Sequence, residues 1–102
     1  MEYKEILEQL HSFDKKRGWD KYHSLIKLSR ALGIESSEVE KIFLWKSTDK
    51  DLSKEDIDNL KMEIADVLIY AFYMCDKLNV NPKDIVQKKL NINKNRHWKF
   101  DD

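Results

Sequence analysis

Hydrophobic residues recur every three to four positions in four segments of the chain, which is the spacing of a helix with one buried face. Ser24 stands at the start of the second segment and Ser53 at the start of the third, where a serine side chain can cap a helix. Asn81 and Pro82 open the fourth, with proline at the first helical position. The pattern predicts helices over residues 3–16, 25–45, 54–78 and 82–96, with a break at 17–20 and a polar loop at 46–52.

Turn-forming residues are too scarce for a fold built from many strands. The 102 residues include two glycines and one proline, whereas a β-sandwich needs a turn signal about every 8 to 12 residues. The length suits one hydrophobic core. We therefore expect a single all-α domain over residues 1–102, built as a four-helix bundle.

The charge balance and the N-terminal residues bear on which partners and which cell compartment we expect. Lysine plus arginine equals aspartate plus glutamate, at 19 each, so the basic surplus typical of nucleic-acid binders is missing. The first residues lack the pattern of a signal peptide, and no uncharged stretch reaches the roughly 18 residues of a membrane span. The one cysteine, Cys75, lies in an apolar run where burial is expected. We expect a cytoplasmic protein that binds neither nucleic acid nor membranes.

Carboxylates occupy positions where two of the predicted helices should be apolar. Glu35 follows the apolar stripe of the second segment, and Glu38 lies about one turn later on the same side. In the third segment Asp66 is the only charge within residues 64–75, and Glu63 precedes it by three residues. A helix that is apolar almost all round is buried almost all round, so we expect Asp66 to be shielded from solvent.

Four carboxylates around one space need a positive partner, because an unpaired buried carboxylate is unstable. Lys41 is the only basic residue within these clusters. A divalent cation with oxygen ligands is the better solution, and magnesium accepts a few carboxylates while keeping positions for water or phosphate. The alternative is that each pair is an exposed stripe on a charged helix. We predict a Mg²⁺ site at Glu35, Glu38, Glu63 and Asp66.

Three motifs stand in a characteristic order along the chain. They are RGWDKYH at residues 17–23, ESSEVEKIFLW at 35–45 and EIADVLIY at 63–70, followed by Lys89, Asn93 and Arg96. In these motifs the chain resembles the MazG-like all-α nucleoside triphosphate pyrophosphohydrolases, especially the compact branch that includes dCTP pyrophosphatases. The chain departs from the family pattern at Leu25-Ile26, often Pro-Lys there, and at Lys41, often Glu.

The resemblance implies an enzyme that hydrolyses a (d)NTP to a (d)NMP and pyrophosphate, with magnesium bound by the four carboxylates. It also implies a homodimer or homotetramer whose central helices complete the bundle. The apolar third helix, in so short a chain, independently favours burial against a partner subunit. In the catalytic hypothesis Glu35 or Glu38 orients the attacking water, and the pattern does not choose between them.

Aromatic and basic residues are candidates for substrate binding. Planar side chains at Trp19, His23 and Trp45 suit stacking on a base, although they suit a core or an interface equally. Tyr70 shares the carboxylate face and is a candidate contact for sugar or phosphate, or equally a core residue with a hydrogen-bonded hydroxyl. Lys89, Asn93 and Arg96 fit the family's K-x-x-x-N-x-x-R pattern for a phosphate-binding arm, or else form a solvated helix end.

Two other classes of function compete with the enzyme. A DNA-binding helix-turn-helix would place its turn at Gly33, but its recognition helix would present Glu35, Glu38 and Glu40 to phosphates. A non-catalytic helical interaction module explains the apolar helices but gives no reason to bury Glu63 and Asp66.

Overall fold

The computed structural model describes residues 1–96, and all regular structure within that range is helical. The elements, in order, are α1 (Tyr3–Arg17), η1 (Asp20–Tyr22), α2 (Leu25–Lys41), η2 (Asp49–Asp51), α3 (Lys54–Lys77) and α4 (Pro82–Lys94), where η marks a short 3₁₀ helix. The predicted all-α class and its four helices are confirmed.

Helices α2, α3 and α4 begin immediately after their predicted capping residues. The Ser24 hydroxyl accepts the backbone N–H of Lys27 at 3.2 Å, and the Asn81 side chain accepts that of Lys83 at 2.8 Å. At the start of α3, Ser53 and Asp56 each accept the other's backbone N–H, at 3.0 and 2.9 Å, which forms a capping box. These bonds satisfy N–H groups that have no partner within a helix.

The end of α2 differs from the prediction. The helix stops at Lys41, and residues 42–45 form a turn in which Trp45 has φ 66° and an almost fully exposed side chain. The loop between α2 and α3 is fixed by polar contacts of its own. Asp51 accepts the N–H groups of Ser47 and Thr48, and Lys46 pairs with Asp56 across the loop at 3.1 Å. The prediction of helix over residues 42–45 is therefore wrong.

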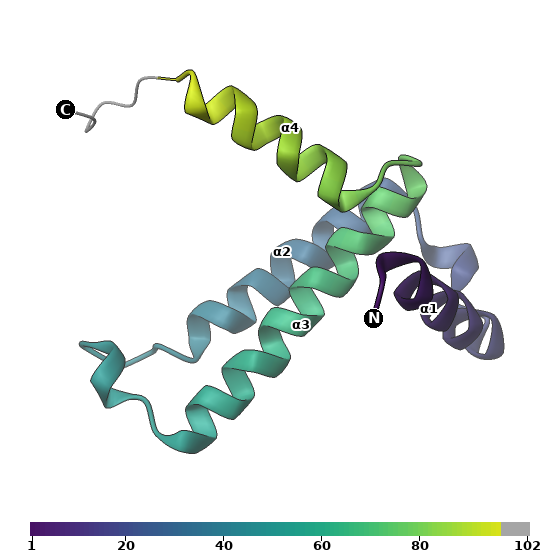
Figure 1. The fold of residues 1–102 in the computed structure, drawn as a ribbon. Coiled ribbons are helices and arrows are strands. Elements are labelled where there is room, and N and C mark those ends of the chain that lie inside the picture. The colour runs from purple at the N-terminus through teal and green to yellow at the C-terminus, as the bar shows by residue number, and fades with distance from the viewer. Residues whose placement is uncertain (97–102) are drawn as a thin grey trace.

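Helices α2 and α3 lie side by side in opposite directions, and α1 lies against the C-terminal half of α3 (Figure 1). The Tyr3 ring meets the edge of Phe72 with centroids 5.3 Å apart, and His11 Nε2 lies 2.8 Å from Asp76 Oδ2. Helix α4 projects away from the other three (Figure 1). The site is therefore built on the α2–α3 pair and on the side of α3 that α1 covers.

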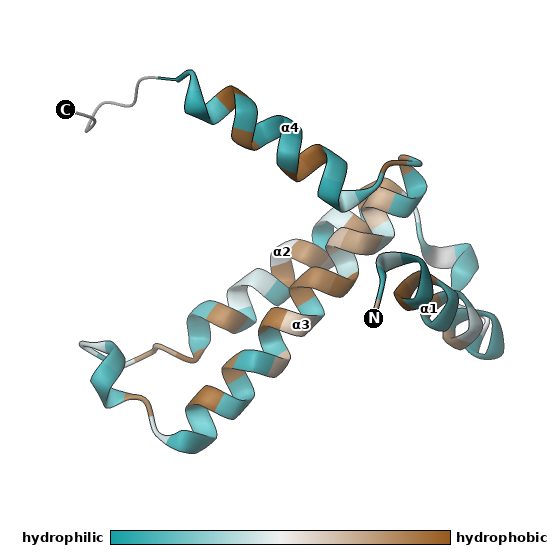
Figure 2. Ribbon diagram, in the orientation of Figure 1, coloured by the Kyte–Doolittle hydropathy of each residue, from teal (hydrophilic) through white to brown (hydrophobic). Residues whose placement is uncertain are grey.

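Few side chains of the single chain are fully buried. The buried apolar side chains among those that the structure describes are Leu28, Tyr73 and Cys75, which confirms the expected burial of the cysteine. Helix α3 is mostly polar in its first half and mostly hydrophobic in its second (Figure 2). Its exposed apolar residues include Met62, at 64% exposure. Within residues 64–75, Ile64 and Leu68 are also exposed, at 44% and 48%. The expectation that this run is buried almost all round is therefore wrong for a single copy of the chain, and Asp66 is partly exposed.

Within residues 1–96, no helix has the length and apolar character needed to cross a membrane.

Leu28 is the most deeply buried apolar side chain, at 2% exposure, and its loss should weaken the fold. We expect Leu28→Ala to lower the free energy of unfolding by about 2–4 kcal/mol, because it leaves a cavity that neighbouring helices fill only partly. Urea unfolding followed by circular dichroism measures this change. Ser29→Ala is the matched control, since Ser29 is exposed on the same turn. Equal stability of the two variants would place the core elsewhere.

Candidate functional site

Three predicted ligands converge between the two central helices. Glu35 comes from α2, and Glu63 and Asp66 come from adjacent turns of α3. One carboxylate oxygen from each lies within 4.8 Å of the other two. The three-residue spacing places the α3 pair on one face, and the antiparallel packing of α2 brings Glu35 to the same place. Three negatively charged groups thus share one small space.

The electrostatics of Glu35 reflect this crowding. Partial burial raises the pKa of its carboxyl group, and the nearby charges of Asp66, Glu63 and Glu38 raise it further. Each of these causes disfavours the ionised form, so a cation at the cluster would be favoured. A set of carboxylate oxygens is also the donor chemistry that magnesium prefers. The residues present therefore fit a divalent metal.

Glu38 stands apart from the other three carboxylates. Its Oε1 atom lies 2.9 Å from Nζ of Lys41, three residues later on the same helix. Its charge acts on Glu35, but it is not part of the three-carboxylate group. The structure thus brings together three of the four predicted ligands, with the fourth held by a local ion pair.

A hollow of about 460 Å³ opens beside the carboxylates, between α1, the η1 region and α3. It is lined by Trp19, His23, Asp66, Tyr70 and Tyr73, among others. Asp66 belongs to both the hollow and the carboxylate group. The volume falls in the range of small-molecule sites. Three predicted substrate-binding residues, at positions 19, 23 and 70, are therefore gathered next to the candidate metal site.

Tyr70 connects the two parts of the site. It lies one helical turn after Asp66 and lines the hollow. Burial raises the pKa of its hydroxyl, and the charges of Glu35, Asp66 and Asp14 raise it further. The hydroxyl therefore keeps its proton near neutral pH and is a hydrogen-bond donor close to the carboxylates.

The other predicted binding residues lie elsewhere in the single chain. Trp45 is 96% exposed and follows the end of α2. Lys89 and Asn93 belong to α4, which projects away from the α2–α3 pair, and Arg96 lies just beyond its end (Figure 1). The side-chain oxygen of Asn93 is buried without a hydrogen-bond partner among the described residues. One copy of the chain does not bring these four residues to the carboxylates.

Sequence reasoning missed Asp14, which is 2% exposed and borders the hollow. Its Oδ2 atom lies 3.5 Å from Nδ1 of His23, and its carboxyl group is hydrogen-bonded to Tyr73. One signal was present: Asp14 falls four residues after Leu10 and seven after Leu7, on the apolar stripe of α1. A carboxyl group at an apolar position of a helix is the same anomaly that identified Glu35.

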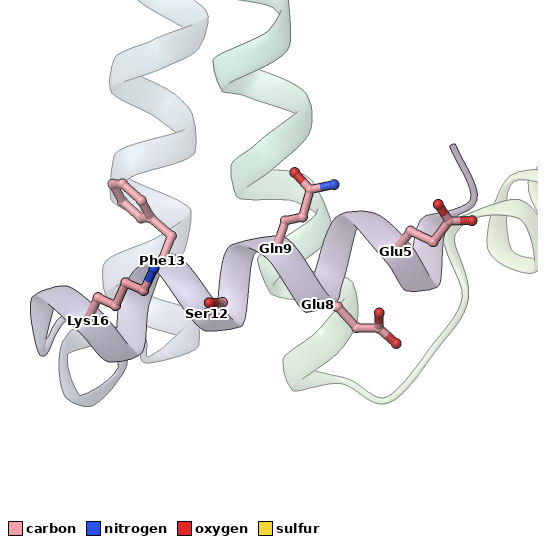
Figure 3. A pocket seen from close by; sticks show the side chains of 6 residues that line it. All are labelled: Glu5, Glu8, Gln9, Ser12, Phe13 and Lys16. Atoms are coloured by element: carbon pink, nitrogen blue, oxygen red, sulfur yellow. The ribbon is translucent and has the colours of Figure 1, made fainter.

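A larger hollow, of about 530 Å³, lies along the outer side of α1 (Figure 3). Its six lining residues, including Glu5, Glu8 and Lys16, all come from that one helix, and none was predicted as a site residue. It is an open surface beside a helix, and the carboxylate group lies elsewhere.

The helix-turn-helix alternative fails on the geometry of α2. The helix continues through Gly33 from Leu25 to Lys41, so the turn that the motif requires is not formed.

Comparisons with known proteins agree with the sequence motifs. Residues 30–102 match the MazG-like family. The chain is 30% identical over 98 residues to dCTP pyrophosphatase 1 of Homo sapiens and 29% identical over 98 residues to that of Mus musculus. Each alignment covers 91% of this chain but only 58% of the relative. A crystal structure of a pyrophosphatase from Archaeoglobus fulgidus superposes with a TM-score of 0.82 at 34% identity, covering 94% of this chain and 92% of that one.

Replacing Glu35 should relieve the repulsion among the carboxylates. The folded-state pKa of Glu35 is raised above its ordinary 4.5, so its contribution to stability is full below pH 4.5 and is lost as the pH rises through the folded pKa. In EDTA at pH 7 we therefore expect Glu35→Gln to be more stable than the wild type, with the difference shrinking as the pH falls towards 4.5. Thermal unfolding over that pH range measures it.

Glu40→Gln, an exposed substitution on the same helix, should change the stability little at pH 7. A Glu35→Gln variant that is less stable than the wild type in EDTA would contradict the claim that repulsion among the carboxylates destabilises the metal-free protein.

Proposed function

The chain belongs to the MazG-like family, and we propose that it is a magnesium-dependent nucleoside triphosphate pyrophosphohydrolase, converting a (d)NTP to a (d)NMP and pyrophosphate. The observation that carries the proposal is the convergence of Glu35, Glu63 and Asp66 beside a hollow of nucleotide size. The relatives named dCTP pyrophosphatase and pyrophosphatase support the reaction class.

Glu35, Glu63 and Asp66 are the proposed metal ligands, and Glu38 is the proposed fourth. Magnesium bound there would neutralise charge on the triphosphate oxygens. Glu38 is the better candidate to orient the attacking water and accept its proton, because its carboxylate lies outside the group of three. Lys41 competes for that carboxylate through the 2.9 Å ion pair. Glu35, already crowded by charge, serves mainly as a ligand.

The hollow is the proposed site for the base and sugar. Trp19 offers a partly exposed ring, which meets the Phe13 ring edge to face with centroids 5.4 Å apart. Cζ of Arg17 lies over the Trp19 ring, 5.4 Å from its centroid. Stacking on such a ring suits any planar base. Tyr70, next to the carboxylates, donates to the sugar or to a phosphate oxygen. The polar edge of His23 provides a directional contact on the same wall.

Assembly into a homodimer or homotetramer completes this proposal. An apolar groove of about 240 Å³ between α2 and α3 is lined by Ser36, Val39, Ile64, Val67 and Leu68. Helix α4 also carries exposed apolar side chains, including Val86 and Leu90. Apolar surface of this kind favours association. In the assembly, Trp45, Lys89, Asn93 and Arg96 are proposed to reach the site of a neighbouring copy.

The reaction is tested by measuring pyrophosphate release from a panel of ribo- and deoxyribonucleoside triphosphates, with magnesium or with excess EDTA. We expect metal-dependent conversion to the monophosphate. Asp66→Asn should lower kcat/KM at least about 100-fold with the fold retained, since it removes a metal ligand. Asp58→Asn, exposed on the same helix, should retain activity.

If no nucleotide in the panel is hydrolysed and the folded protein does not bind magnesium, the proposed enzymatic activity is refuted. That result would leave a helical interaction module, which the exposed apolar faces of α3 and α4 also suit.

Assembly is tested by placing a charge on the apolar groove. Leu68→Glu should shift the protein towards monomer in sedimentation velocity, because the groove would then bury an unpaired charge. Asn59→Glu adds the same charge at an exposed polar position of α3 and should leave the assembly unchanged. A wild-type protein that sediments as a monomer at micromolar concentration would contradict the proposed assembly.

A further inference from the structure

Asp14 is the most buried charged residue in the described part of the chain. Acidic side chains are rarely buried to this degree unless they are paired, and apolar replacements of buried charges are often more stable. A chain with so few buried side chains gains little stability from such a residue. The contacts of Asp14 indicate what else it does.

The carboxyl group of Asp14 contacts two residues that line the hollow. Nδ1 of His23 lies 3.5 Å from Oδ2, and the Tyr73 hydroxyl forms a hydrogen bond with the same carboxyl group. Burial raises the pKa of that hydroxyl, and the hydrogen bond and charge of Asp14 raise it further, so Tyr73 keeps its proton and donates. The backbone carbonyl of Asp14 accepts the N–H of Trp19 at 2.9 Å. One residue of α1 thus holds three residues of the hollow.

These contacts restrict the His23 ring. Its side chain is only 17% exposed, and the ring packs on Tyr73 with centroids 4.4 Å apart and planes at 58°. An ionised carboxylate can only accept a hydrogen bond, so it favours a proton on the nitrogen that faces it. With Nδ1 facing the Asp14 carboxylate, Nε2 is the ring nitrogen that remains for contact with a ligand.

We propose that Asp14 is a positioning residue: it fixes the ring of His23, so that Nε2 makes one directional hydrogen bond to the base or sugar of a bound nucleotide. The identity of that ligand rests on the proposed function. The placement of the ring rests on its contact with Asp14 and its packing on Tyr73, and does not depend on the proposed function. Asp14 itself need not touch the nucleotide, because it acts through His23.

Kinetics with the best substrate of the panel test this role. Asp14→Asn should raise KM about ten-fold, the loss of one well-placed hydrogen bond, while kcat changes less than about two-fold. His23→Gln should raise KM by a similar factor. The double variant should be no worse than His23→Gln, because the two residues act through one contact. The proposal would be overturned if the KM increases of the two single variants multiply in the double variant, or if KM is unchanged in Asp14→Asn.

Asp76→Asn is the matched control. It removes a carboxylate that contacts His11 of α1 at 2.8 Å. Neither Asp76 nor His11 lines the 460 Å³ hollow; both line a separate pocket of about 190 Å³, which His23 and Tyr73 also border. The variant should leave KM unchanged even where it lowers the melting temperature. An equal rise of KM in Asp76→Asn would show that loosening α1 is the cause, which would also overturn the positioning role.

Nitrogen-15 NMR of the histidine rings provides a readout that needs no turnover. In the wild type the shifts should place a proton on Nδ1 of His23, and Asp14→Asn should reduce that preference. Should Asp14→Asn fail to fold, Tyr73→Phe keeps the carboxyl group and should keep the Nδ1 proton. A wild-type His23 protonated on Nε2 alone would overturn the proposal. If the NMR result is as expected but no pyrophosphate is released, the proposed enzymatic activity is refuted, while the claim that Asp14 places the His23 ring still stands.

Discussion

The mutual repulsion of three carboxylates, held within 4.8 Å of one another, is the constraint on which the rest of this structure depends. The α2–α3 packing must work against it, and the capping box at Ser53 and the buried Leu28 are among the interactions that do so. Such an arrangement is costly without a cation and favourable with one. A metal bound by these carboxylates would replace their mutual repulsion with attraction to the ion.

The geometry of α3 joins the charge cluster to the hollow. Successive turns carry Glu63, Asp66, Tyr70 and Tyr73, so one helix face runs from the carboxylates to the wall that α1 completes. A triphosphate bound at the acidic end would extend its nucleoside towards Trp19 and His23. In the proposed function, this order along α3 would run from the phosphates at the carboxylates to the nucleoside at the hollow.

Much of this fold follows from local patterns in the sequence. Helical periodicity and the caps at Ser24, Ser53 and Asn81 predict the helices closely, because caps and apolar faces act within one turn. The end of α2 was harder to predict, since the loop that follows it carries an ion pair between Lys46 and Asp56, ten residues apart. The place of α4 was unpredictable for another reason: residues 1–96 leave its apolar face exposed.

In the candidate site, too, the local spacing of residues was predictable, whereas the partners of individual side chains were not. The three-residue spacings correctly place Glu63 with Asp66, and an apolar stripe broken by Glu35 marks the second helix. Spacing alone does not choose the partner of a side chain, so the ion pair of Glu38 with Lys41 was not foreseen. The burial of a carboxyl group at Asp14 is explained by its contacts with His23 and Tyr73, 9 and 59 residues further along the chain. Only the folded structure reveals these contacts.

Manganese, which prefers the same oxygen ligands as magnesium and is paramagnetic, tests the central claim most directly. Substoichiometric manganese added to the isotope-labelled protein broadens the NMR signals of nuclei near the bound ion. We predict broadening centred on the backbone amides around Glu35, Glu63 and Asp66, reversed by excess magnesium and weakened in Asp66→Asn. Broadening centred elsewhere, or none at all in the folded protein, would contradict a metal site at these carboxylates.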